Sequence, residues 1–125
     1  MIKILTVSIE DNSFEDLTSE MKMHNDINLF QVRTSDAALN MASDNSLDLV
    51  ISDEDLGDIT GLEFVSRLLK VNPMVNSALV SSLSPEEFHE TSEGLGIMAQ
   101  LPKNPGREDV QDLLEKLKQI KGMLS

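Results

Sequence analysis

Five short apolar segments alternate along this chain with five segments whose apolar residues have helical spacing. The apolar segments are rich in Ile, Leu and Val, and they lie within residues 2–9, 27–32, 47–51, 78–80 and 97–101. Short apolar runs of this kind indicate strands that are buried on both faces. Strands that alternate with helices through short connections require a parallel sheet with right-handed crossovers and helices on both faces. The sequence therefore predicts a doubly wound α/β fold with the pattern (βα)5.

Helix-start signals follow several of these segments. The clearest is Ser84-Pro85-Glu86-Glu87, which combines a capping hydroxyl, a proline at the first helical position and acids at the positive end of the helix dipole. Further starts are predicted at Asn12, at Ser35 and at Thr60. The last helix is amphipathic and is predicted to extend over residues 110–124.

Length and composition limit the classes of function. The chain has 125 residues, and we expect a single domain over residues 1–125. It has no cysteine, which excludes disulfides, thiolate metal sites and a cysteine nucleophile. A formal net charge of −12 disfavours binding to the phosphate backbone of nucleic acids. No apolar stretch is long enough for a membrane helix or a signal peptide, so we expect a cytoplasmic protein without a membrane partner.

Polar residues follow four of the five predicted strands. They are Glu10 and Asp11 after the first strand, Asp53 after the third, Ser81 and Ser82 after the fourth, and Lys103 after the fifth. The carboxyl ends of parallel strands meet at one edge of the sheet, where α/β proteins bind ligands near the topological switch point. Three carboxylates gathered there repel each other unless a hard cation such as Mg²⁺ lies among them. A hydroxyl and an ammonium opposite that cation would complement a phosphoryl group, so these residues indicate phosphoryl transfer onto a carboxylate.

These motifs resemble the receiver domains of response regulators in two-component systems, and the resemblance covers the whole chain. The similar segments are Glu10-Asp11, Ile51-Ser52-Asp53 with Leu56 and Gly61, Ser81-Ser82, and the stretch from Gly96 to Lys103. The resemblance implies a flavodoxin-like fold with strand order 2-1-3-4-5. It also implies that Asp53 accepts the phosphoryl group.

The same resemblance assigns roles to the other site residues. The implied Mg²⁺ ligands are Asp53, Asp11, Glu10 through a water molecule, and the backbone carbonyl of Asp55. Ser81 and Lys103 would bind phosphoryl oxygens. The implied donor is a histidine kinase or a phosphotransfer protein. The resemblance implies a signalling module and not an enzyme, in which the phosphoryl group is lost by slow self-dephosphorylation. We expect the signal to pass by contact with a downstream protein, unless the chain is part of a longer regulator.

Four positions depart from the family's usual pattern. Glu10 replaces the commoner Asp, a change that a water-mediated contact absorbs more readily than a direct one. Gly57 stands where proline is usual, which predicts a more mobile loop. Asn104 follows Lys103 where the family usually has proline after a cis peptide bond. Gln100 replaces an aromatic switch residue, and we expect it to stay at the surface because burying an unpaired amide costs about 1–3 kcal/mol.

Two other functions remain open at this point. A degenerate receiver would keep the fold as an unphosphorylated interaction module. Gln100, Gly57 and Asn104 favour this function, whereas the clustered Asp11, Asp53, Ser81 and Lys103 disfavour it. A phosphatase of the haloacid dehalogenase type also has two aspartates two positions apart after an apolar strand, as in Asp53-Glu54-Asp55. Those enzymes carry their acidic pair after the lysine, however, and this chain has no room for a cap domain.

Overall fold

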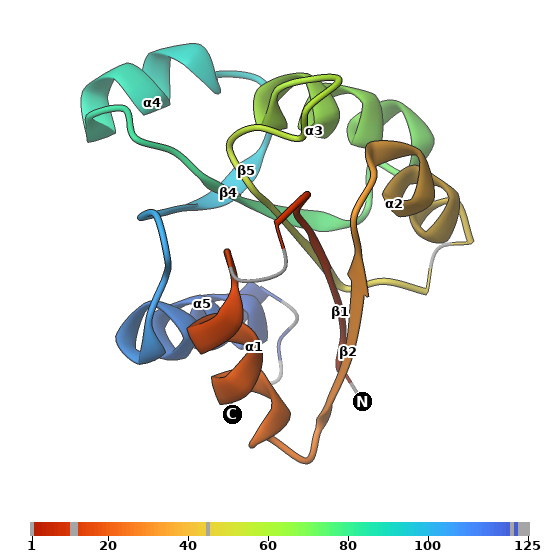
Figure 1. The fold of residues 1–125 in the computed structure, drawn as a ribbon, viewed down its shortest axis with the longest axis vertical. Helices are drawn as coiled ribbons and strands as arrows, with labels where there is room; N and C mark the ends of the chain where they lie inside the picture. Colours follow the sequence, from red (N-terminus) through yellow and green to blue (C-terminus); the bar gives the residue numbers. More distant parts are fainter. Residues whose placement is uncertain (1, 11–12, 45, 121, 123–125) are drawn as a thin grey trace.

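The computed structural model describes residues 2–10, 13–44, 46–120 and 122. Strands and helices alternate along these residues as predicted (Figure 1). They are β1 (Ile2–Val7), α1 (Glu15–Lys22), β2 (Ile27–Val32), α2 (Ser35–Ala42), β3 (Leu49–Ser52), α3 (Gly61–Val71), β4 (Asn76–Val80), α4 (Pro85–Thr91), β5 (Ile97–Leu101) and α5 (Arg107–Ile120).

The strands form one parallel sheet with the order β2-β1-β3-β4-β5, which confirms the predicted doubly wound fold. From β1 the chain moves to one edge of the sheet, and from β3 it moves toward the other edge. This reversal places a topological switch point between the carboxyl ends of β1 and β3. The register of the two strands pairs Val7 with Ser52, so Ser8 and Asp53 leave the sheet side by side.

Two apolar cores cover the two faces of the sheet. Ile4 and Ile51 belong to the core under α1 and α5, whereas their chain neighbours Leu5 and Val50 belong to the core under α2 and α3. Figure 1 shows α1 and α5 together on one side of the sheet and α2 and α3 on the other. Successive side chains of a strand point to opposite faces, so both must be apolar in a sheet that is covered twice. This explains why the strands are continuous apolar runs in the sequence.

Side-chain caps fix the starts of α2, α3 and α4. Ser84 and Thr60 cap α4 and α3 as predicted, and each accepts a hydrogen bond of 3.2 Å from the amide three residues on. At α2 the predicted cap is wrong by one residue. Thr34 has the extended backbone of a cap and accepts from the Ala37 amide at 3.1 Å, whereas Ser35 is the first helical residue and is buried.

The first strand ends earlier than predicted, at Val7 and not at Ile9. Pairing with both neighbouring strands stops at Val7. Beyond it the Ser8 hydroxyl accepts from the Glu10 amide at 3.2 Å, which turns the chain out of the plane of the sheet. Ser8 and Ile9 therefore follow the strand directly, and the predicted acidic pair begins one position after them.

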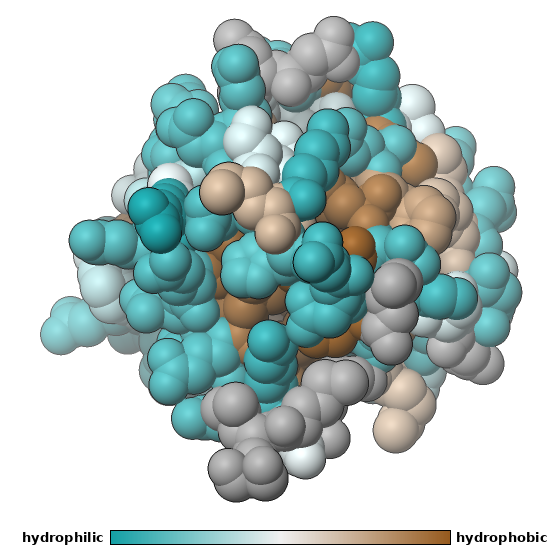
Figure 2. Space-filling view, turned by 90° about the horizontal axis from the view of Figure 1, so that it is seen from below, coloured by the Kyte–Doolittle hydropathy of each residue, from teal (hydrophilic) through white to brown (hydrophobic). Residues whose placement is uncertain are grey.

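Two predicted helix boundaries fall on residues outside the described part of the chain. They are Asn12 and the end of the last helix beyond Ile120, which includes residues 121, 123 and 124. The start predicted at Asn12 is nevertheless too early, because α1 begins at Glu15 after Phe14, whose side chain makes no capping hydrogen bond. Where the structure describes the chain, no helix is both long and apolar enough to cross a membrane. In the view from below, hydrophilic residues cover most of the surface and hydrophobic residues are visible between them (Figure 2).

Candidate functional site

Asp53 lies directly after β3 at the carboxyl edge of the sheet, and it is partly buried. Its backbone amide donates to the Val7 carbonyl at 3.0 Å, which holds the residue against the end of β1. Its carboxylate accepts from Ser8 Oγ at 3.0 Å through Oδ2 and from the Glu54 amide at 2.8 Å through Oδ1. Each carboxylate oxygen keeps a further lone pair. The carboxylate is therefore fixed in orientation and can still accept another partner.

The Ser8 hydroxyl is within reach of two acceptors. Its oxygen lies 3.0 Å from Asp53 Oδ2 and 3.1 Å from the Glu10 carbonyl oxygen. A hydroxyl has a single proton, and a carboxylate is the stronger acceptor because the hydrogen bond is charge-assisted. We infer that Ser8 donates mainly to Asp53, which makes it a direct partner of the candidate acceptor that the sequence patterns did not indicate.

The loop between β3 and α3 is closed by backbone contacts. The Glu54 carbonyl accepts from the Gly61 amide at 2.8 Å, and Asp55 pairs with Thr60 in an isolated antiparallel bridge. Gly61 packs against the Asp53 carbonyl so closely that a Cβ atom would overlap it. Only glycine fits there without movement of the segment that carries Asp53.

The second residue after β1 contributes an alkyl group to the rim of the site. Ile9 is 42% exposed, and its side chain lies 3.9 Å from the position that a Cβ of Gly57 would take. Gly57 has a φ of 88°, a conformation that favours glycine. Ser8 thus borders Asp53 with a hydroxyl and Ile9 borders the following loop with an alkyl group, and neither is a charged oxygen ligand of the kind that Mg²⁺ prefers.

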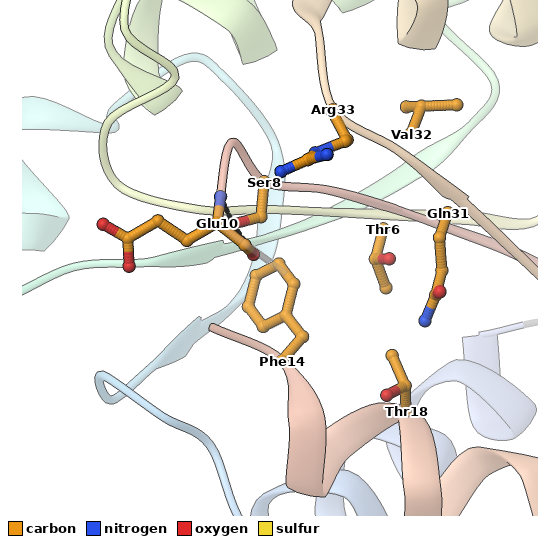
Figure 3. Close-up of a pocket in the computed structure, with 8 residues that line it drawn as sticks. All are labelled: Thr6, Ser8, Glu10, Phe14, Thr18, Gln31, Val32 and Arg33. Atoms are coloured by element: carbon orange, nitrogen blue, oxygen red, sulfur yellow. Dashed lines mark hydrogen bonds between the residues drawn. The ribbon is translucent and has the colours of Figure 1, made fainter. Parts of the chain in front are cut away.

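The predicted cation ligands do not gather within the described residues. Glu10 is exposed, its nearest side-chain partner is Ser13 Oγ at 3.5 Å, and in Figure 3 its carboxylate extends away from Ser8. Asp55 is exposed and accepts from the Gly57 amide at 2.9 Å. Asp11 lies outside the described residues. Within the described ranges no three acidic or histidine side chains form a group that could hold a metal ion, so this part of the chain does not by itself fit Mg²⁺.

Ser81 and Ser82 follow β4, next to the end of β3. Ser81 is buried, its amide donates to the Leu101 carbonyl at 3.1 Å, and its hydroxyl accepts from the Leu83 amide at 3.2 Å. Ser82 is exposed, and both its amide and its hydroxyl donate to Glu54 Oε2, at 2.7 and 3.0 Å. The residue after Asp53 thus binds the loop after β4. No sequence motif indicated Glu54 as part of the site.

Lys103 follows β5 at the same edge of the sheet and is exposed. It has no ion pair with any other residue in the described ranges, so its long side chain is not tied to Asp53. Asn104 has a φ of 54°, and the described residues contain no cis peptide bond. The family's cis proline is therefore replaced here by a trans peptide and a residue in the left-handed region.

Gln100 does not stay at the surface as predicted. It is partly buried, and its Nε2 donates to the Leu83 carbonyl at 2.8 Å and to the Ser81 carbonyl at 3.3 Å. The prediction assumed an unpaired amide, whose burial is unfavourable. The loop between β4 and α4 supplies two acceptors, so the amide is paired and can be partly buried without that penalty.

A small cavity lies beside the site between β1, α1 and β2. Figure 3 shows Thr6, Ser8, Thr18 and Gln31 around it, with Arg33 at the end of β2. Its volume is about 50 Å³. Pockets that enclose small-molecule ligands usually have about 300–1,000 Å³, so this cavity has room for water molecules and not for an organic substrate.

Comparison with known proteins agrees with the fold described above. The family described as response regulator receiver domain matches residues 5–117. The fold is similar to the response regulator domain of CheB from Thermotoga maritima, with 21% identity, 95% coverage of both chains and a TM-score of 0.78. It is also similar to a CheY-like response regulator receiver domain protein from Methanospirillum hungatei JF-1, with 18% identity, 98% coverage of both chains and a TM-score of 0.83.

The N-terminal domain of an uncharacterized protein from Wolinella succinogenes has the same fold, with 20% identity, full coverage of both chains and a TM-score of 0.80. No curated protein matches the chain in sequence. The family match covers most of the chain, and the strand order agrees with it. The chain belongs to the response regulator receiver domain family.

Proposed function

We propose that Asp53 accepts a phosphoryl group from a phosphohistidine of a histidine kinase or a phosphotransfer protein. Receiver domains are signalling modules that interact with such donors and with downstream effectors. The proposal rests on the carboxylate of Asp53, which is partly exposed at the switch point with both oxygens fixed by donors at 3.0 and 2.8 Å. A fixed nucleophile at the carboxyl edge of a parallel sheet is suited to in-line phosphoryl transfer.

In the proposed reaction one carboxylate oxygen of Asp53 attacks phosphorus and the phosphorus–nitrogen bond breaks. The free ring nitrogen of the phosphohistidine takes a proton from solvent water, so that the leaving group is neutral imidazole. Ser8 and the Glu54 amide orient the nucleophile. Lys103 is exposed at the end of β5, and its free ammonium can approach the phosphoryl oxygens as negative charge gathers on them. Ser81, at the end of β4, can donate its hydroxyl proton to the same oxygens.

We also propose that the chain binds Mg²⁺ through Asp11, Glu10, Asp53 and the Asp55 carbonyl. A bound cation would neutralise charge on the phosphoryl oxygens. The described residues do not form this ligand set, and we assign the cation no step in the transfer. We expect weak Mg²⁺ binding by calorimetry that is lost in Asp11→Ala. Equal affinity in the variant and the wild type would show that the acidic pair is not the cation site.

The decisive experiment is incubation with acetyl phosphate, with and without Mg²⁺, followed by borohydride trapping and mass spectrometry. We expect an adduct on Asp53, no adduct in Asp53→Asn, and an unchanged yield in Asp36→Asn, which removes an exposed carboxylate on α2. Trapping at another aspartate would refute the assignment of the acceptor.

A second candidate function is an unphosphorylated interaction module with the receiver fold. It is favoured by Ser8, which places an uncharged hydroxyl beside Asp53, and by Ile9, which places an alkyl group beside the following loop, since neither is a charged ligand for a cation. If saturating acetyl phosphate leaves Asp53 unmodified both with and without Mg²⁺, this function replaces the first. Signalling would then depend on the surface of the folded domain alone.

A further inference from the structure

Glu54 connects three parts of the site through three different groups. Its amide donates to Asp53 Oδ1 at 2.8 Å, and its carbonyl accepts from the Gly61 amide at the start of α3, also at 2.8 Å. Its carboxylate accepts from the amide and the hydroxyl of Ser82 at 2.7 and 3.0 Å. The side chain of Glu54 therefore connects the Ser82 donors to the residue that directly follows the candidate phosphoacceptor.

The contact has the form of an anion bound to two donors. Both donors of Ser82 converge on the same oxygen, Glu54 Oε2, and hydrogen bonds to a charged acceptor are shorter and stronger than neutral ones. A phosphoryl group on Asp53 would bring about two negative charges and several acceptor oxygens into this small region. The phosphoryl oxygens and the Glu54 carboxylate would repel each other and compete for the same donors.

We propose that Glu54 is an internal anion that occupies the Ser82 donors in the unphosphorylated chain and is displaced by the phosphoryl group on Asp53. The displacement step rests on the proposed function, whereas the occupancy of the donors does not. Release of Ser82 would loosen the loop of residues 81–83, whose Ser81 and Leu83 carbonyls also accept hydrogen bonds from Gln100. Phosphorylation of Asp53 would thereby change the loop that leads into α4.

The first test detects the hydrogen bond between Ser82 and Glu54 and requires no phosphorylation. In NMR spectra at neutral pH, the Ser82 amide proton should move upfield in Glu54→Gln, because the variant replaces the charged acceptor of its hydrogen bond by a neutral one. The Ser82 amide proton should keep its wild-type position in Glu115→Gln, which makes the same change of charge at an exposed position on α5. An identical position of the Ser82 amide proton in all three proteins would overturn the occupancy.

The second test measures the rate of Asp53 phosphorylation by acetyl phosphate in the same three proteins. Removing one like charge at about 4 Å in a solvated site corresponds to about a fivefold faster reaction, which we expect for Glu54→Gln and not for Glu115→Gln. An unchanged or slower rate in Glu54→Gln would overturn the displacement. If no protein is phosphorylated, the proposed function fails together with the displacement step, and the NMR position of the Ser82 amide proton still decides whether Glu54 holds the loop.

Discussion

Replacing Gly61 by alanine should destabilise the domain and disturb Asp53 together. Gly61 is the first residue of α3 and is buried, and its amide donates to the Glu54 carbonyl at 2.8 Å. A Cβ atom at this position would overlap the Asp53 carbonyl oxygen and Leu79 Cδ1. Its φ is not in the left-handed region, so the backbone itself tolerates alanine and the effect is steric. The Leu79 side chain can move, but the Asp53 carbonyl can move only with the loop.

The magnitude follows from the cost of inserting a methyl group into a packed interior. Overpacking of this kind destabilises by about 1–3 kcal/mol. For a domain of this length the entropy of unfolding makes 1 kcal/mol equivalent to about 4 °C in Tm, so we expect Tm to fall by roughly 4–12 °C. Thermal and urea unfolding followed by circular dichroism would measure the change.

Gly106→Ala provides the matched control. Gly106 directly precedes α5, its φ is also outside the left-handed region, and a Cβ there would meet no atom within 4 Å. We expect its effect to stay within about 1 kcal/mol, the range of glycine-to-alanine changes at compatible sites. In the folded Gly61→Ala variant the yield of the Asp53 adduct should also decrease. Equal Tm values for the two variants would refute the steric argument.

Three further predictions concern polar groups. Asn72→Ala should lower the free energy of unfolding, measured in urea, by about 2–3 kcal/mol. Asn72 is 2% exposed and donates to the Ala42 carbonyl of α2 at 3.0 Å, which would be left unpaired. A decrease below about 0.5 kcal/mol would contradict this. Ser8→Asp should place a second carboxylate beside Asp53 and raise Mg²⁺ affinity about tenfold by calorimetry, and an unchanged affinity would argue against a cation site there. Gln100→Ala should accelerate amide hydrogen exchange in residues 81–83, and unchanged exchange would show that its two hydrogen bonds do not hold the loop.

The fold could be predicted in nearly all its features because its determinants are local and repeated. Apolar runs of strand length that alternate with helical segments, such as residues 47–51, indicate strands buried on both faces, and the caps at Thr60 and Ser84 are short-range patterns. The wrong cap residue predicted for α2 also has a local cause. Thr34 and Ser35 are adjacent hydroxyl residues with similar capping ability, and only the extended backbone at Thr34 distinguishes them.

The candidate site was less predictable because its contacts join residues that are distant in sequence. Asp53 could be placed at a strand end from the apolar run before it, but its bond to Ser8 spans 45 positions. The bond between Ser82 and Glu54 spans 28 positions, and the bond of Gln100 to Leu83 spans 17. Polar side chains in loops have many possible partners, and sequence periodicity does not select among them.

The end of β1 shows how a small error in a strand boundary changes the chemistry expected at a site. Hydrophobicity alone extends the strand through Ile9, which would bring the acidic pair to the edge beside Asp53. Pairing ends at Val7 because the neighbouring strands end there, and the Ser8 hydroxyl then turns the chain. A hydroxyl that donates to Asp53 stabilises an isolated carboxylate, whereas a carboxylate in its place would need a cation. Because a hydroxyl and not a carboxylate contacts Asp53 from the end of β1, phosphorylation in the absence of Mg²⁺ is the most informative measurement on this chain.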